Sequence, residues 1–125
     1  MTEILPLRGE IYLLDWSPGR GSEQAGLRPG LILQNDKGNM YSPTTIVAAI
    51  TTSSGKTYPF QVHLEPEESG LPKPSTVLLE QIMTVDKRRL VKKVGQIGSV
   101  KISEVEKAIH RSLGMSCKQF TPDVG

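Results

Sequence analysis

A succession of short β-rich segments, separated by proline, glycine and polar turn residues, constrains the fold of this chain more than any other feature. Pro18 ends the first segment, because proline lacks the N–H that a central strand needs, and Ser53-Ser54-Gly55 ends the third. The segments expected to form strands are 9–16, 31–35, 44–52, 58–65, two pieces of 75–90 with a bend near Glu80, and 91–97. The segments expected to be irregular are a turn at Asp36, Gly38 and Asn39 and a Pro/Gly-rich loop at 66–74.

A single amphipathic helix is indicated near the C-terminus, where apolar residues recur at three- and four-residue steps. These residues are Ile102, Val105, Ile109 and Leu113. Ser99 is the expected N-cap and Gly114 the expected C′ residue. Many short strands followed by one helix predict a mainly β (α+β) fold, a strongly bent antiparallel sheet or small barrel with the helix covering one end. Residues 1–115 are expected to form one domain and 116–125 a loose tail.

Composition places the chain among ordinary soluble domains. The formal charge is +2, so the chain is mildly basic, which permits a polyanionic partner without requiring one. No apolar run approaches the ~20 residues of a membrane span, and the N-terminus does not resemble a secretion signal. Cys117 is the only cysteine and forms no internal disulfide, which favours a reducing, cytoplasmic location without membrane attachment.

The chemistry-bearing residues do not form a familiar catalytic motif. The two histidines, His63 and His110, are far apart in the sequence, and the acidic pairs Glu67-Glu68 and Glu104/Glu106 are expected to be solvated. The sequence contains no GxxxxGK[ST], GxGxxG or GxSxG motif. We therefore expect neither a metal site nor a cofactor, and a nucleophile carried by the protein is not indicated.

The loop RGSEQAGLRPG (20–30) is long, charged and glycine-rich for a connection between two strands. Together with SPTTIVAAIT and LEQIMTVDK, which follow it in this order, it resembles the MazF/PemK family of toxin ribonucleases. The resemblance covers residues 8–115. It implies an SH3-like barrel of about six or seven strands with a C-terminal helix, usually a homodimer, in agreement with the strand pattern. The loop is then expected to border the active site, and its glycines are expected to let it change conformation around bound RNA.

The implied activity is that of the toxin of a type II toxin–antitoxin system: a sequence-specific endoribonuclease that cleaves single-stranded mRNA. In this reaction the ribose 2′-OH attacks the adjacent phosphate, so neither a protein nucleophile nor a metal is needed. The enzyme must hold the RNA extended, move protons and neutralise the phosphate charge. The implied inhibitor is a MazE-like antitoxin, whose acidic, partly disordered segment would occupy the RNA groove.

The resemblance also implies roles for individual residues. Arg28 and Thr51 match the catalytic pair, and Glu23 matches a loop acid needed for activity. Arg28 would offer paired donors to two phosphate oxygens, and Thr51 would donate its hydroxyl or orient the nucleophile. Glu23 would position Arg28 or transfer a proton, while Ser22 and Gln81 match RNA-contacting positions. From the residues alone, Arg28 could instead tether the loop, Thr51 be a plain strand residue and Glu23 a solvated charge.

Further basic residues are candidates for contacts with the RNA backbone. Arg20 lies in the charged loop, and Lys87 and Arg88 belong to the basic run DKRRLVKK (86–93). The alternative for this run is a solvated strand edge whose charges discourage aggregation.

Three positions depart from the family pattern. Gly30 replaces a small apolar or β-branched residue and is expected to weaken its strand, and Met40 and Met83 stand where arginines are expected. Loss of two cations would weaken phosphate binding or alter sequence preference. Two alternative functions therefore stay open: a non-catalytic gyrase-binding toxin of the same superfamily, and an attenuated member that only binds antitoxin.

Overall fold

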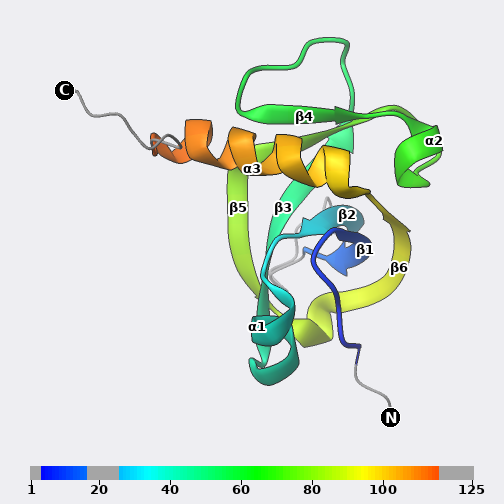
Figure 1. Cartoon of the computed structure of the whole chain (residues 1–125). Coiled ribbons are helices and arrows are strands. Elements are labelled where there is room, and N and C mark those ends of the chain that lie inside the picture. Colours follow the sequence, from blue (N-terminus) through cyan, green and yellow to red (C-terminus); the bar gives the residue numbers. More distant parts are fainter. Residues whose placement is uncertain (1–3, 17–25, 116–125) are drawn as a thin grey trace.

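The computed structural model (Figure 1) describes residues 4–16 and 26–115 and contains one six-stranded sheet with three helices. The strands are β1 (Glu10–Asp15), β2 (Leu27–Ile32), β3 (Thr44–Thr52), β4 (Gln61–Leu64), β5 (Ser75–Asp86) and β6 (Leu90–Gln96). The helices are α1 (Asp36–Tyr41), α2 (Pro66–Ser69) and α3 (Ser99–Leu113), and a 3₁₀ turn, η1 (Lys87–Arg89), joins β5 to β6.

The sheet is antiparallel throughout, with strand order β4-β5-β3-β2-β1-β6. It curls so strongly that β1 and β2 cross the long strands β3 and β5 in Figure 1. The two end strands, β4 and β6, do not pair with each other, so the sheet is barrel-like but not closed. The predicted mainly β fold with a C-terminal helix is confirmed.

The start of β2 differs from the sequence prediction. The strand begins at Leu27 rather than at residue 31, because β1 pairs with residues 27–31, from Ile11–Leu31 to Asp15–Leu27. The predicted strand 58–65 is likewise shorter, since β4 covers only Gln61–Leu64. The earlier start of β2 matters because it places Arg28 on a strand instead of in a loop.

The bend expected near Glu80 is present, but it does not divide the segment into two strands. Ala48 pairs with Ile82 whereas the next residue, Ala49, pairs with Leu78, so residues 79–81 form a bulge in a continuous β5. Bulges bend a strand and increase its twist without ending it. The bulge therefore lets one twelve-residue strand follow the curl of the sheet.

The core divides into two clusters on opposite faces of β3. Ala48 and Ile50 belong to the larger cluster, and Val47 belongs to the smaller one. Alternate residues of a strand point to opposite faces, so an apolar run such as TTIVAAITT is needed where both faces are covered. The expectation that 44–52 forms a buried strand is confirmed in its bounds, although the last two residues, Thr51 and Thr52, are exposed.

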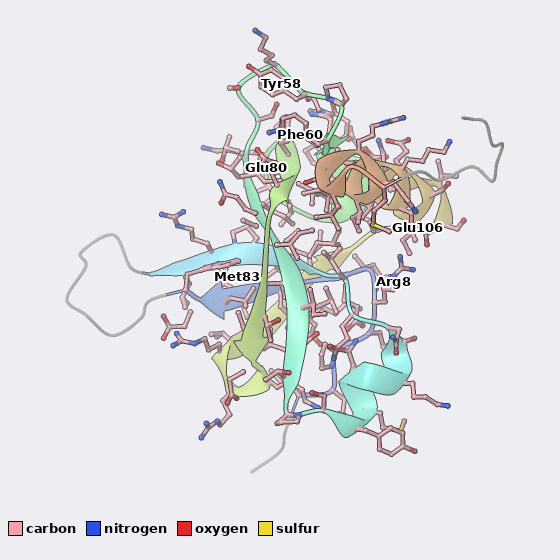
Figure 2. All side chains as sticks on the ribbon, turned by 90° about the vertical axis from the view of Figure 1, so that its left-hand side faces the viewer. Arg8, Tyr58, Phe60, Glu80, Met83 and Glu106 are labelled. Atoms are coloured by element: carbon pink, nitrogen blue, oxygen red, sulfur yellow. The ribbon has the colours of Figure 1, made fainter. Side chains whose placement is uncertain are left out.

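Helix α3 packs against β4 and β5 through its buried residues Val105 and Ala108. Its end at Leu113 and the αL conformation of Gly114 (φ 71°) agree with the prediction, but the helix begins one residue earlier than predicted, with Gly98 rather than Ser99 as the N-cap. A second contact comes from the N-terminal segment, because Nη2 of Arg8 donates to Oε2 of Glu106 at 2.9 Å (Figure 2).

Two segments predicted to be irregular contain short helices. Asn35 caps α1, since its side-chain oxygen accepts from the N–H of Gly38 at 2.7 Å, and the expected turn at 36–39 becomes a helix. Glu65 and Glu68 form a capping box around α2, which ends at Gly70 with φ 86°. Among the described residues, no helix is long and apolar enough to cross a membrane.

Candidate active site

Arg28 and Thr51 lie on neighbouring strands at the same end of the sheet. The register of β2 and β3 pairs Gly30 with Ala49, and continuing it by two residues brings Arg28 opposite Thr51. Backbone pairing stops short of them, consistent with Pro29, which has no N–H to donate. Both side chains are exposed, and the Arg28 guanidinium has no hydrogen-bond or ion-pair partner among the described residues.

The two residues line one hollow of ≈ 590 Å³, which we call the Arg28 hollow. Its lining residues are Leu13, Arg28, Pro29, Ile50, Thr51, Thr52, Leu71, Pro72, Lys73, Ser75 and Val94. Two cations, Arg28 and Lys73, therefore share a mostly apolar surface in which no described lining residue is acidic. Such a surface strengthens the attraction of an anion, because fewer water molecules screen the charges.

Trp16 and Gly30 fix the backbone that carries Arg28. The indole N–H of Trp16 donates to the carbonyl oxygen of Arg28 at 3.0 Å. A Cβ atom on Gly30 would lie 2.7 Å from Cδ1 of Leu14 and 3.2 Å from Cζ2 of Trp16, so a side chain there would displace both. Gly30 thus permits close packing of Leu14 and Trp16 on β2. The sequence prediction considered only that a glycine weakens the strand and did not foresee this packing role.

Thr51 is held from the other side by β5. It pairs with Thr76, and just beyond it the N–H of Ser53 donates to the carbonyl oxygen of Pro74 at 2.9 Å. That contact brings the segment 71–75, including Lys73, next to the end of β3. The ammonium of Lys73 has no hydrogen-bond or ion-pair partner among the described residues, so it is available to a ligand.

The remaining predicted site residues are not gathered here. Arg20, Ser22 and Glu23 lie outside the described residues, so their predicted roles stay predictions. Gln81 is exposed in the bulge of β5 but does not line the Arg28 hollow.

The structure corrects the prediction for Lys87. Its side chain is buried, and its ammonium donates to the carbonyl oxygen of Asn39 at 2.6 Å, so it fastens η1 to α1 instead of facing solvent. Arg88 is exposed, but its guanidinium donates two hydrogen bonds and its backbone N–H a third to the Asp86 carboxylate, which lowers the pKa of that carboxyl to about 2. Asp86 pairs with Thr44, at the opposite end of β3 from Thr51, ~23 Å along the strand.

Among the described residues, no group of three or more His, Cys, Asp or Glu side chains lies close enough to hold a metal ion. Met40 and Met83, the positions where arginines were expected, are exposed on α1 and β5 and do not line the Arg28 hollow (Figure 2 labels Met83). The lack of arginines at these two positions therefore leaves the charge of the residues that line this hollow unchanged.

A family model described as "PemK-like, MazF-like toxin of type II toxin-antitoxin system" matches residues 7–113. The chain belongs to this family. It is 50% identical over 110 residues to Endoribonuclease MazF of Staphylococcus epidermidis, covering 87% of this chain and 92% of that protein. A MazE–MazF crystal structure from Deinococcus radiodurans matches with a TM-score of 0.76 at 27% identity, over 91% of this chain and all of the other. An endoribonuclease in complex with its cognate antitoxin from Mycobacterial species has a TM-score of 0.75 at 25% identity, over 90% and 99%.

Sequence reasoning about this MazF-family chain missed Lys73 and the aromatic pair Tyr58 and Phe60. Lys73 is one cation in a Pro-rich loop, and nothing in the local sequence indicates that the loop folds back onto β3. The sequence pattern predicted that Tyr58 belongs to a half-buried strand, whereas it lies before β4 and is 46% exposed. An exposed aromatic beside a predicted turn is the signal that could have been used.

Proposed function

We propose that this chain, an endoribonuclease toxin of the MazF type, cleaves single-stranded RNA in the Arg28 hollow by promoting attack of a ribose 2′-OH on the adjacent phosphate. One observation carries the proposal: Arg28 and Thr51, on adjacent strands, line the same hollow. A cation with paired donors and a hydroxyl donor are the groups that this reaction needs around the phosphate.

The reaction balances without a protein nucleophile. The O2′–P bond forms, the P–O5′ bond breaks, and the products are a 2′,3′-cyclic phosphate and a 5′-OH end. Arg28 would bind two phosphate oxygens and neutralise the charge that builds up on them, since a guanidinium is permanently charged and bidentate. Thr51 would donate its hydroxyl to a third oxygen or orient the 2′-OH.

Two protons must also move, one from the 2′-OH and one to the departing O5′. By resemblance Glu23 takes part in this transfer or positions Arg28, and Ser22 and Gln81 contact the RNA. RNA-only specificity follows from the chemistry, because DNA lacks the attacking hydroxyl. A metal ion is not required for any of these steps.

We also propose the regulation and assembly that go with this activity. The MazF relatives include a structure named MazE–MazF and an endoribonuclease with its cognate antitoxin. A MazE-like antitoxin with an acidic segment would be attracted to the cations Arg28 and Lys73 and would exclude RNA from the hollow. A cytoplasmic homodimer is the expected working form.

The test is cleavage of a long single-stranded RNA by the purified chain, with and without EDTA. Arg28→Ala and Thr51→Val are each expected to lower kcat by about 10²–10³-fold, as for loss of one transition-state donor. Lys107→Ala, a charge-matched change on the exposed face of α3, is expected to keep full activity. Absence of cleavage by the wild type, with antitoxin binding intact, would instead support the alternative that the chain is an attenuated family member that only binds antitoxin.

A further inference from the structure

A second, smaller hollow lies beside Thr51, on the side of β5. It measures ≈ 160 Å³, and we call it the Tyr58 hollow. Its lining residues are Thr51, Thr52, Ser54, Lys56, Tyr58, Gln61, Thr76 and Leu78. Thr51 and Thr52 line both hollows, so a strand of RNA whose phosphate is bound by Arg28 and Thr51 would have a neighbouring group at the Tyr58 hollow.

The floor of the Tyr58 hollow contains an unsatisfied hydroxyl. Thr76 is 3% exposed, and its Oγ1 atom has no hydrogen-bond partner among the described residues. Directly paired residues of an antiparallel sheet share a face, so this hydroxyl lies on the same face as Thr51, its partner on β3. Buried polar atoms in native proteins are nearly always hydrogen-bonded, so this hydroxyl has an unused hydrogen bond that a ligand in the hollow could make.

The wall of the Tyr58 hollow is an aromatic ring held in place. The rings of Tyr58 and Phe60 lie parallel, within 6°, with centroids 5.7 Å apart (Figure 2). The N–H of Tyr58 donates to Oε1 of Gln61 at 3.1 Å, and Nε2 of Gln61 donates to Oε2 of Glu80 at 2.7 Å. Tyr58 is nevertheless 46% exposed, so a ring that is already held in position faces solvent.

A cation completes the Tyr58 hollow. The ammonium of Lys56 lies 5.6 Å from the centroid of the Tyr58 ring and has no carboxylate partner among the described residues. This long exposed side chain can swing aside when a flat group stacks on the ring, and its charge would attract a phosphate.

We propose that the Tyr58 hollow is a nucleobase subsite, in which a base next to the cleaved phosphate stacks on Tyr58 and hydrogen-bonds to the Thr76 hydroxyl. This inference rests on the proposed RNA cleavage and adds the residues that choose the base. Stacking accepts any base, so Tyr58 supplies affinity. The buried hydroxyl favours a base with a matching donor or acceptor, so Thr76 supplies selectivity.

The size and chemistry of the hollow favour a base over other occupants. Its volume of ≈ 160 Å³ is well below the ~300–1,000 Å³ of pockets that take drug-sized ligands, so it suits one ring system. An apolar side chain of an antitoxin peptide would leave the Thr76 hydroxyl unsatisfied and the Lys56 ammonium without an anion.

The test measures base preference in two ways, one of which does not need cleavage. Cleaved ends from a randomised single-stranded RNA pool are sequenced, and binding of a randomised single-stranded DNA pool, which lacks the 2′-OH, is scored position by position. The variants are Tyr58→Ala, Tyr58→Phe and Thr76→Val. The last of these removes the hydroxyl but keeps the shape of the buried side chain. Tyr41→Ala, at an exposed tyrosine of α1, is the matched control.

Tyr58→Ala is expected to weaken binding and kcat/KM by roughly 5- to 150-fold, with Tyr58→Phe within about 2-fold of the wild type. Thr76→Val is expected to lose preference at one position next to the cut and to keep it elsewhere. Folding of each variant is verified by thermal unfolding, and Thr76→Val is expected to be at least as stable as the wild type.

The outcomes separate this inference from the proposed function. Wild-type cleavage with unchanged base preference in Tyr58→Ala and Thr76→Val overturns the subsite and leaves the nuclease intact. Base-selective binding that Thr76→Val abolishes, without any cleavage by the wild type, supports the subsite and overturns the nuclease. Weakened antitoxin binding with unchanged nucleic-acid binding in Tyr58→Ala assigns the hollow to the peptide and overturns the proposal.

Discussion

Replacement of Gly30 by alanine tests whether close packing on β2 positions the site. The added Cβ would lie 2.7 Å from Cδ1 of Leu14, 3.2 Å from Cζ2 of Trp16 and 3.4 Å from the carbonyl oxygen of Ala48. Leu14 is fully buried, so it cannot move into solvent to relieve the contact. Overpacking of this kind costs about 1–3 kcal/mol, and the lower backbone entropy of alanine offsets about 0.5–1 kcal/mol of it. The difference spans about 0–2.5 kcal/mol, and because the added Cβ would lie 2.7 Å from an atom of a fully buried side chain, we expect a net loss of about 1–2 kcal/mol of unfolding free energy.

The assay is equilibrium unfolding in urea, with the slope m expected to stay constant. Gly98→Ala is the matched control, because among the described residues no atom beyond the chain neighbours would lie within 4 Å of an added Cβ, and it is expected to cost less than about 1 kcal/mol. The double variant Gly30→Ala/Leu14→Val removes the clashing methyl group, so its loss is expected to be smaller than the sum of the two single losses.

Activity is expected to fall together with stability, because Trp16 hydrogen-bonds to the backbone of Arg28. Displacement of the indole would shift the guanidinium, and a misplacement of about 1 Å can cost about 10²-fold in rate. A Gly30→Ala protein as stable and as active as the wild type would refute the packing argument.

The remaining predictions address charges inside and outside the site. Lys73→Ala is expected to raise KM and reduce the salt dependence of RNA binding by about 0.7 in log–log slope, while Lys107→Ala, on α3, changes neither. Because the folded-state pKa of Asp86 is lowered from 3.8 to about 2 by Arg88, its contribution to stability is present above pH 4 and is lost as the pH falls toward 2. Asp86→Asn should therefore flatten the stability profile in that window, as measured by urea unfolding at each pH. Lys87→Met is expected to cost about 1–3 kcal/mol of unfolding free energy, because the buried carbonyl oxygen of Asn39 loses its donor.

The elements that local patterning determines were predictable. The apolar β-branched run between Pro43 and Ser53 has one compatible structure, and β3 has the predicted bounds. Helix α3 also follows from the spacing of its apolar residues, although its N-cap is one residue earlier than expected. In both cases the residues that decide the structure are neighbours in the sequence.

The rest depends on contacts between distant residues. The sequence around Leu27 does not indicate that this residue pairs with β1, and Pro29 even disfavours a strand here. The bulge of β5 is visible only in its register with β3. Long-range pairing of this kind is not encoded in periodicity.

The site was predictable only in part for the same reason. Arg28 and Thr51 were singled out by resemblance to the MazF/PemK family, and their common hollow depends on the β2–β3 register. Lys73 joins them only because the loop after α2 folds back onto the end of β3. Lys87 was misjudged because a basic run does not reveal which of its members is buried.

The most direct measurement of the central claim is a double-mutant cycle on the single-turnover cleavage rate with Arg28→Ala and Thr51→Val. If both groups act on one phosphate, the double variant should be little slower than the slower single variant, because residues that act as a unit have non-additive effects. A double variant whose rate loss equals the product of the two single losses would mean that the two side chains act independently, and it would contradict the account.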